Sequence, residues 1–245
     1  MSMTKRQNEI LDLLHENGFM TVEKLANVMF TSQSSIRRDL TKLQNLSLVR
    51  RTHGGAEALG EINDAVPFNS RMAKNVSEKR KIAKVAQVLL KDGQSVMLDG
   101  STTAGFLIPY IAKHKDMIVF TNNMLTAISS VNYGIKTYCI GGLSVNQSVV
   151  LSGDAAYRAI ADIYPDILFF SSKSIDKDGG VYDPIPEENY IRELMLKNAK
   201  YRVFLCDSEK FGKRSLYKLT DLDKIDACVF DKPFSELKTK CKVLF

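Results

Sequence analysis

Residues 32–45 constrain this chain more than any other segment, because they combine an apolar stripe with a basic outer face. Ile36, Leu40 and Leu43 fall at i, i+4 and i+7, which places them on one side of a helix. Ser32 precedes them and is expected to be the N-cap. The opposite side and its flanks carry short polar and basic residues: Ser34, Ser35, Arg37, Arg38, Thr41, Lys42 and Asn45. Such a face suits the DNA major groove, where guanidinium groups contact guanine and hydroxyls or amides contact base edges and phosphates.

Two shorter helices are expected before this segment. The first spans about residues 5–17 and ends at Gly18, a residue type favoured after helix C-termini. The second follows Thr21, which is placed to cap it, and a turn at residues 30–31 leads into the basic helix. Short helices joined by a tight turn, the last one basic outside and apolar inside, predict a helix-turn-helix.

A β-wing is expected directly after the helices. Residues 48–56 alternate in polarity and contain a double glycine, and three side chains are placed to reach the DNA backbone or minor groove: Arg50, Arg51 and His53. A small helical bundle with solvated charges is the alternative from the pattern alone. Local charge favours DNA, because residues 34–55 hold five Lys and Arg against a single acid, Asp39.

Composition places the chain among globular proteins, with 44% hydrophobic and 25% charged residues. The net charge of +6 is weak evidence for DNA binding, because residues 1–60 hold eight Lys and Arg against six Asp and Glu. Four cysteines and three histidines are dispersed, so we expect no metal, cofactor or disulfide framework, and reduced thiols in the cytoplasm. No apolar stretch approaches transmembrane length, so no membrane partner is expected.

The chain is expected to divide into two domains. Residues 1–57 hold the winged helix-turn-helix, and residues 58–70 lose helical periodicity and read as a linker. Residues 71–245 alternate apolar strands with amphipathic helices. The predicted fold is therefore a small all-α or winged helix-turn-helix domain followed by an α/β domain with a mostly parallel sheet.

Polar loops follow several predicted strands of the second domain, where open α/β sheets bind ligands. The residues expected there are Asp99, Gly100, Ser101, Thr102, Thr103, Thr121, Asn122, Gly141, Gly142 and Lys210. Residues 99–103 are the most informative, because backbone N–H groups and hydroxyls at the start of a helix attract anions. Lys210 adds a point charge for a phosphate. Ordinary turn and cap residues are the alternative, but several such loops at successive strand ends favour a pocket.

Four runs of sequence resemble the DeoR family of bacterial transcriptional regulators. Ser-Ile-Arg-Arg-Asp-Leu at 35–40 and Leu-Val-Arg-Arg-Thr-His-Gly-Gly-Ala at 48–56 are similar to its N-terminal domain, with Ser35 where Thr is usual. Leu-Asp-Gly-Ser-Thr-Thr at 98–103 and Asp-Ser-Glu-Lys-Phe-Gly at 207–212 resemble its C-terminal sensor domain. The resemblance implies an α/β domain similar to ribose-5-phosphate isomerase, a phosphorylated sugar as effector, and operator DNA as partner.

Lys173 departs from the family pattern, which more often has small and acidic residues at this point. It is expected either to meet a second anionic group of the effector or to pair with Glu187 or Glu188, and a surface lysine is the alternative. The departure concerns the identity of the effector and leaves the expected fold unchanged.

Together these features predict a DNA-binding transcriptional regulator, a repressor of sugar or carbohydrate metabolism genes, whose operator affinity responds to a phosphorylated sugar. A homodimer or homotetramer is expected, because one recognition helix reads too few base pairs. The alternative is a sugar-phosphate isomerase-like enzyme with an accessory DNA-binding domain, and a regulator without effector is a third option. Isomerisation needs a positioned carboxylate base, and the acids near strand ends do not form the isomerase pattern. We therefore expect no catalytic residue.

Overall fold

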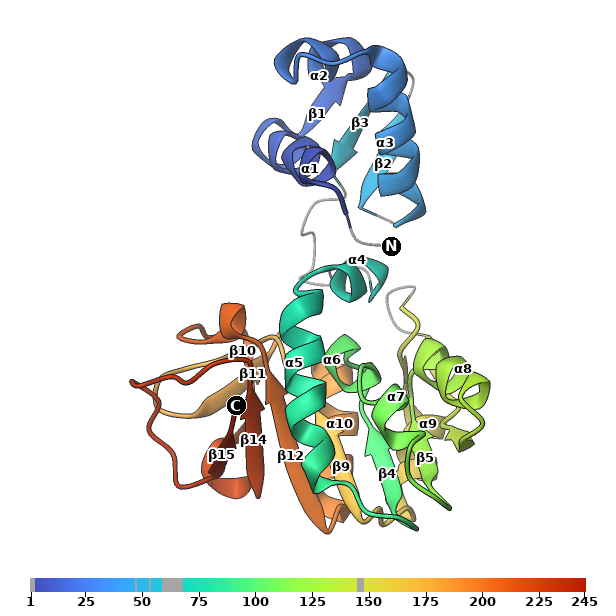
Figure 1. Ribbon diagram of the computed structural model, residues 1–245, viewed down its shortest axis with the longest axis vertical. Coiled ribbons are helices and arrows are strands. Elements are labelled where there is room, and N and C mark those ends of the chain that lie inside the picture. The colour runs from blue at the N-terminus through green and yellow to red at the C-terminus, as the bar shows by residue number, and fades with distance from the viewer. Residues whose placement is uncertain (1–2, 47, 53, 59–67, 145–147) are drawn as a thin grey trace. The chain divides into compact units, whose positions relative to one another are not determined.

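The computed structural model describes residues 3–46, 48–52, 54–58, 68–144 and 148–245, and the chain forms two compact units, residues 1–76 and 77–245 (Figure 1). Most of the expected linker, residues 59–67, lies outside the described residues. Its two ends have regular structure, since Ala58 closes a strand and residues 68–70 begin a helix. Within the described ranges, every helix is too short or too polar to span a bilayer.

The N-terminal unit combines short helices with an antiparallel sheet. Its elements are α1 (Lys5–Asn17), β1 (Phe19–Thr21), α2 (Val22–Val28), α3 (Gln33–Asn45), β2 (Val49–Thr52), β3 (Gly55–Ala58) and α4 (Phe68–Ala73). The caps predicted for α2 and α3 are confirmed: Thr21 Oγ1 and Ser32 Oγ accept hydrogen bonds from backbone N–H groups at 3.1 and 3.2 Å. Each cap satisfies a donor that the first helical turn leaves unpaired.

The predicted wing is the hairpin β2–β3, and β1 adds a third strand on the other side of β3. Sequence periodicity missed β1, because three residues are too few for an alternating pattern. Gly55 in β3 lies against the β1 backbone, and a Cβ there would sit 2.4 Å from the carbonyl oxygen of Met20. The close pairing of the wing with β1 therefore requires glycine at this position.

The core of the N-terminal unit forms where the helices meet the sheet. Ile36, Leu40 and Leu43 of α3 are completely buried against α1 and α2 residues such as Leu14 and Leu25. Each such side chain contributes about 1.5–3 kcal/mol by leaving water. This packing confirms the apolar face predicted for α3 and turns the polar face outward.

The second unit has alternating strands and helices. Its elements are α5 (Val76–Ala86), η1 (Gln87–Leu89), β4 (Ser95–Leu98), α6 (Thr102–Gly105), α7 (Ile108–Ile111), β5 (Ile118–Thr121), α8 (Met124–Asn132), β6 (Lys136–Cys139), β7 (Leu143–Ser144), β8 (Leu151–Ser152), α9 (Asp154–Ala161), β9 (Ile167–Phe170), β10 (Ser174–Ile175), β11 (Gly180–Asp183), α10 (Pro186–Asn198), β12 (Tyr201–Cys206), η3 (Ser208–Lys210), β13 (Tyr217–Asp221), η4 (Leu222–Lys224), β14 (Ala227–Phe230) and β15 (Lys242–Leu244).

The main sheet of this unit runs in the order β15-β14-β12-β9-β4-β5-β6, and all its described pairs are parallel. The predicted fold class is therefore confirmed. A small antiparallel sheet, β10-β11-β13, and the pair β7-β8 were not predicted from sequence. Strands β7, β8 and β10 have two residues each, β11 and β13 are not continuous apolar runs, and the register of all five depends on partners that tertiary structure brings close.

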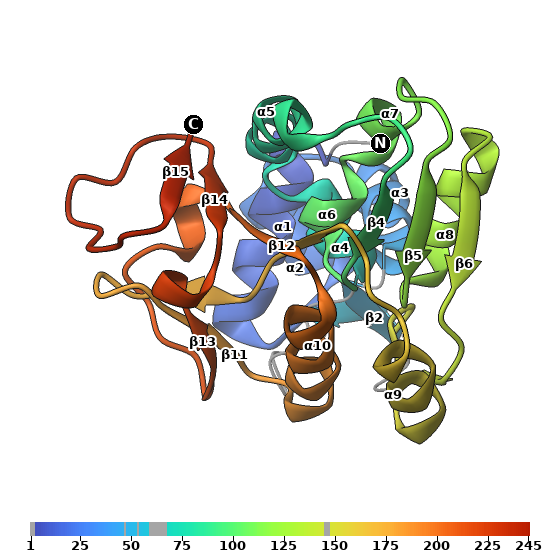
Figure 2. The same cartoon turned by 90° about the horizontal axis from the view of Figure 1, so that it is seen from below.

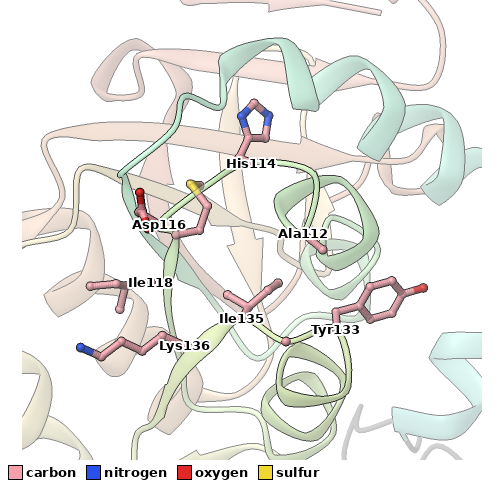
Figure 3. Close-up of a pocket in the computed structure, with 9 residues that line it drawn as sticks. Ala112, His114, Asp116, Ile118, Tyr133, Ile135 and Lys136 are labelled. Carbon is pink, nitrogen blue, oxygen red and sulfur yellow. The ribbon is translucent and has the colours of Figure 1, made fainter.

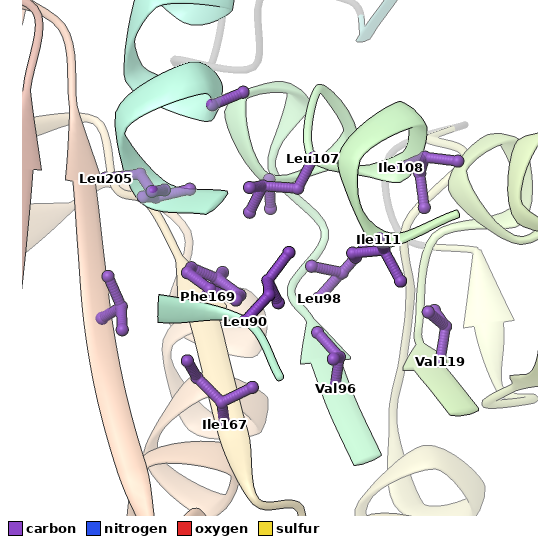
Figure 4. Close-up of a cluster of buried hydrophobic side chains, with 14 of the residues drawn as sticks. Leu90, Val96, Leu98, Leu107, Ile108, Ile111, Val119, Ile167, Phe169 and Leu205 are labelled. Carbon is purple, nitrogen blue, oxygen red and sulfur yellow. The ribbon is translucent and has the colours of Figure 1, made fainter. Parts of the chain in front are cut away.

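Helices cover both faces of the main sheet (Figure 2). Val96 and Leu98 of β4 point into a cluster that includes residues of α5, α6 and α7 (Figure 4). Met97 between them points to the opposite cluster, which includes residues of α9 and α10. Strands buried on both sides read as continuous apolar runs, which is why the sequence indicated them clearly.

Candidate DNA interface and effector site

The polar face of α3 is exposed along its length. The side chains of Ser34, Arg37, Arg38, Thr41, Lys42 and Asn45 are all solvent-exposed, as is the cap Ser32. Two of the arginines are held by neighbours on the helix: Arg37 Nη2 donates to Gln33 Oε1 at 3.1 Å, and Arg38 Nη2 donates to Ser35 Oγ at 3.5 Å. Ser35 is half-buried. The helix thus presents a row of donors in a defined arrangement.

The wing is hydrogen-bonded to the recognition helix. Arg51 Nη1 on β2 donates to Thr41 Oγ1 on α3 at 3.1 Å, and that hydroxyl in turn donates to the carbonyl of Arg37 at 2.9 Å. Arg50 pairs with Glu57 across the β2–β3 hairpin, so this arginine is neutralised within the wing. His53, the third basic residue predicted for the wing, lies outside the described residues.

Asp39 is a structural residue of α3 that sequence reasoning counted only as charge. It is buried, accepting from Arg6 Nε at 2.6 Å and from Gln7 Nε2 at 2.9 Å. Its position on the same side as Leu40 and Leu43 was the available signal. Because Asp39 fixes α3 to α1, its negative charge faces inward and does not oppose DNA phosphates.

The loops predicted for an effector come together at the carboxyl ends of parallel strands. Asn123 after β5 donates from Nδ2 to the carbonyl of Gly100 after β4 at 3.1 Å. Lys210 after β12 donates from Nζ to Ser171 Oγ after β9 at 2.9 Å. The backbone N–H of Ser171 donates to Asp99 Oδ2 at 3.4 Å. Four successive strand ends are therefore linked into one polar cluster.

The loop at 99–103 leads into a helix of one turn, and the helix predicted there is broken into α6 and α7. Pro109 at the start of α7 lacks a backbone N–H, which favours a new helix start. Ser101 Oγ caps α6 by accepting from the Ala104 N–H at 3.2 Å. Since the helix dipole grows with the number of aligned peptides, α6 attracts an anion less than expected. The remaining attraction comes from local N–H groups, hydroxyls and Lys210.

Arg192 on α10 is the buried cation at the centre of this cluster, only 3% exposed. Its guanidinium lies 2.9 Å from Asp99, 3.2 Å from Asp183 and 2.8 Å from Glu188. Burial lowers the pKa of Arg192, but Asp183, Glu188 and Asp99 outweigh it and raise that pKa above its ordinary value. The residue therefore stays charged. Sequence reasoning missed it, although the i,i+4 spacing from Glu188 was a signal.

Residues 148–152 lie across the loop at 99–103. A Cβ on Gly100 would meet Val150 Cγ1 at 2.5 Å, so the glycine makes room for this valine. The Leu151 N–H donates to the Asn122 carbonyl, and Asn122 Nδ2 donates back to the Leu151 carbonyl, both at 2.8 Å. Residues 148–152 thus form a cover over Gly100 and Asn122, and the nearby Asp99, Thr103 and Thr121 are, like Asn122, completely or almost completely buried.

Three predicted residues stand apart from the buried cluster: Gly141, Gly142 and Lys173. Gly141 and Gly142 are exposed, and a Cβ on Gly142 would lie 2.5 Å from the carbonyl oxygen of Ser152, so this glycine allows a close backbone approach. Lys173 is exposed as well. Of its two expected partners, Glu188 binds Arg192.

A hollow of about 460 Å³ opens at the amino ends of β5 and β6, away from these loops (Figure 3). It is lined by Ala112, His114, Asp116, Met117, Ile118, Tyr133, Gly134, Ile135 and Lys136. The His114 ring hydrogen-bonds to Asp92 at 2.9 Å. In the described part of the chain, no group of three or more His, Cys, Asp and Glu is arranged to hold a metal ion.

The helix-turn-helix, its wing and the outward cations of α3 define a DNA-binding protein of the winged helix-turn-helix class. Residues 6–61 match the DeoR-like helix-turn-helix domain, and residues 74–232 match the DeoR C-terminal sensor domain. The chain therefore belongs to the DeoR family of transcriptional regulators, as its sequence motifs predicted.

Relatives align over nearly the whole chain. The HTH-type transcriptional regulator GolR of Listeria innocua is 32% identical over 95% of this chain and 92% of its own length. The glycerol-3-phosphate regulon repressor of Escherichia coli K12 is 26% identical over 95% of this chain and 92% of its own. Among solved structures, ribose 5-phosphate isomerase A of Methanocaldococcus jannaschii matches 56% of this chain and 55% of its own at 17% identity, with a TM-score of 0.43. The full-length relatives are regulators, and the protein is a regulator and not an enzyme.

Proposed function

We propose that this protein represses genes of sugar or carbohydrate metabolism, binding operator DNA through α3 and the wing and responding to a phosphorylated sugar at the strand-end loops. The outward cationic face of α3 carries the proposal, because its one acid, Asp39, is turned inward and paired. Each predicted domain has its own proposed role: residues 1–57 bind DNA, residues 71–245 bind the effector, and residues 58–70 are the linker that connects them.

Individual contacts follow from position on the helix. Arg38 lies near the middle of the exposed face of α3 and is assigned to base edges in the major groove. Arg37 and Lys42 on the flanks, and Arg51 on the wing, are assigned to phosphates. Arg51 also fixes the wing against α3 through Thr41, so the two parts should engage DNA as one surface.

The DNA contacts are tested with Arg38→Ala and Lys42→Ala on promoter fragments of the neighbouring genes. Arg38→Ala should weaken operator binding by about 1–3 kcal/mol and relax sequence preference, because a base contact is lost. Lys42→Ala should weaken all sequences alike and flatten the salt dependence. Fluorescence anisotropy at several salt concentrations measures both, with Lys91→Ala as control for loss of charge in the second unit. Unchanged affinity and preference in Arg38→Ala would contradict the assignment.

Several features support an anionic, hydroxyl-bearing effector. Within the described residues, the buried Thr103 Oγ1 and Asn122 Oδ1 have no hydrogen-bond partner. Such atoms cost about 1–3 kcal/mol each, so a polar ligand or water that satisfies them is favoured. Lys210 supplies a cation, which contacts the Ser171 hydroxyl and the Asp207 carboxylate and would turn toward a phosphate when the effector binds. The name of one relative refers to the regulon of a phosphorylated compound, glycerol 3-phosphate.

Entry of the effector requires a local movement. Val150 occupies the space beside Gly100, and Leu151 is tied to Asn122 by paired hydrogen bonds. We expect these contacts to open when a phosphorylated sugar binds. The phosphate is expected on the side of Thr102 and Lys210, because the carboxylates of Asp183 and Glu188 around Arg192 repel it.

A further inference from the structure

Helix α8 turns its apolar side chains away from the protein. Met124, Ile128 and Val131 fall at i, i+4 and i+7 on one face, and the last two are 57% and 61% exposed. The side that packs toward the sheet is built from small or polar residues that are buried: Thr126, Ala127 and Ser130. The usual pattern of a surface helix, apolar inside and polar outside, is reversed here.

The same face carries no charge. Leu125 at its edge is also exposed, and none of the nine residues of α8 is Asp, Glu, Lys or Arg. Tyr133, just after the helix, is exposed too, but it follows Met124 by nine residues and so lies half a turn away. Depletion of charge and enrichment of large apolar and aromatic side chains mark the core of protein interfaces. Charged residues border the Tyr133 end, where Asp116 and Lys136 line the adjoining hollow, as in a polar rim (Figure 3).

We propose that the face formed by Met124, Leu125, Ile128 and Val131, here called the α8 face, is where two copies of this chain associate. An uncharged face offers no charge pattern to select a different protein, whereas two identical apolar faces complement each other across a two-fold axis. At the exposed fractions of its four side chains, this face presents roughly 300 Å². That is less than half of the ~800 Å² per partner in a stable interface, so the face would form an apolar core that a surrounding rim completes.

The proposal deepens the proposed function and rests on it, because a second copy supplies the second recognition helix. Helix α8 also starts at the effector loops. Asn123 is buried, and its Oδ1 accepts from the N–H groups of Leu125 and Thr126 at 2.9 and 3.0 Å. Its Nδ2 donates to the carbonyl of Gly100. A ligand that moves the loop at 99–103 therefore acts on the first turn of α8, and through it on how two copies are oriented.

The first test places a charge in the α8 face. Val131→Glu should raise the dimer dissociation constant at least about 100-fold, because two buried carboxylates would face each other across the axis. Val88→Glu is the matched control, since Val88 is 70% exposed outside this face, and it should dimerise like the wild type. Sedimentation velocity of the full chain without DNA measures both, and circular dichroism checks folding. A Val131→Glu dimer as tight as the wild type, or a monomeric wild type at micromolar concentration, would overturn the proposal.

A second test does not depend on disrupting the face. Ile128 lies near the middle of α8, so a two-fold contact brings its two copies together. Ile128→Cys, made with Cys139→Ser to remove an exposed thiol, should form an intermolecular disulfide with oxidised glutathione, whereas Val88→Cys in the same background should not. Absence of a cross-linked dimer in Ile128→Cys would overturn the proposal. Such an absence is expected if the α8 face binds the chain's own N-terminal unit and not a second copy. A cross-linked dimer that does not bind operator DNA would contradict the proposed function but not the proposed dimer interface.

Discussion

Buried charges organise the sensing unit one residue at a time. Arg192 pairs with three carboxylates: Asp99 just after β4, Asp183 at the end of β11 and Glu188 on α10. Asp99, the first residue of the loop at 99–103, accepts hydrogen bonds from Arg192, Ser101 and Ser171. Its role in this conformation is to shape the loop, so ligand contacts are expected from the hydroxyls that follow it.

Removal of Arg192 tests this arrangement. Arg192→Met should lower the free energy of unfolding by about 3–5 kcal/mol, because Asp99, Asp183 and Glu188 would remain buried without their cation. Arg158→Met, at an exposed position of α9, should change it by less than about 0.5 kcal/mol. Urea denaturation of both variants gives the comparison. A loss below about 1 kcal/mol for Arg192→Met would mean that the carboxylates are compensated elsewhere.

Sequence reasoning succeeded at residues whose role depends on local spacing. The outer face of α3 follows from periodicity, and each residue predicted on it that the structure describes is on it or at its edge. Arg192 and Asp39 were missed because decisive partners of each are distant along the chain: Arg192 binds Asp99 from 93 residues away, and Arg6 binds Asp39 from 33. The local partner Glu188, four residues before Arg192, does not by itself indicate a buried cluster. No local pattern specifies such pairs.

At the scale of elements, Asp166 joins the amino ends of three neighbouring strands. It stands just before β9, and its carboxylate accepts from the backbone N–H and hydroxyl of Ser95 on β4 at 2.9 and 2.6 Å. Lys200, just before β12, donates to it at 2.8 Å. Lys200 and Ser95 together lower the pKa of Asp166 to about 2. The side chain is one-third exposed, so solvent screens part of this stabilisation.

Asp166→Asn should therefore destabilise the second unit in a pH-dependent way. The folded pKa of about 2 lies below the unfolded value of about 3.9, so the ionised group stabilises the fold above pH 4, and this contribution is lost as pH falls toward 2. We expect the free energy of unfolding of Asp166→Asn to be about 1 kcal/mol lower than that of the wild type at pH 7, because solvent screens the partly exposed carboxylate. Urea denaturation at pH 7 and at pH 3 measures the free energy of unfolding of both proteins. The difference between the variant and the wild type should be smaller at pH 3. A difference that is constant or larger there contradicts this role.

Elements with a clear local sequence pattern were predicted, whereas elements that depend on long-range contacts were missed. Strands β4, β9, β12 and β14 are buried on both faces, so their sequences are recognisable as apolar runs. Strand β10 has only two residues, and β11 and β13 mix polar or charged residues with apolar ones, so none of the three forms a continuous apolar run. Their pairing joins segments that are distant along the chain. The candidate effector loops were predicted because they follow the strands of the main sheet, whereas the cover formed by residues 148–152 depends on tertiary contacts alone.

At the scale of the molecule, the proposed function requires a coupling free energy between DNA binding and effector binding. The N-terminal unit carries the DNA-binding face, and the second unit carries the proposed effector site and the α8 face. The effector can regulate operator binding only if it has different affinities for the conformation that binds operator tightly and the one that binds it weakly. Equal affinity for both would leave the equilibrium between them unchanged. Coupling of this kind typically amounts to about 1–3 kcal/mol.

The most direct test of the central claim is calorimetric titration of triose, pentose and hexose monophosphates into the full chain, with and without operator DNA. Unphosphorylated sugars and Lys210→Ala serve as controls, and neither should give tight binding. A phosphorylated sugar that changes operator affinity by some factor must itself bind with an affinity changed by the same factor when operator is present. We predict this reciprocal change for one member of the panel. Tight binding of a phosphorylated sugar with identical operator affinity in its presence and absence would contradict the account.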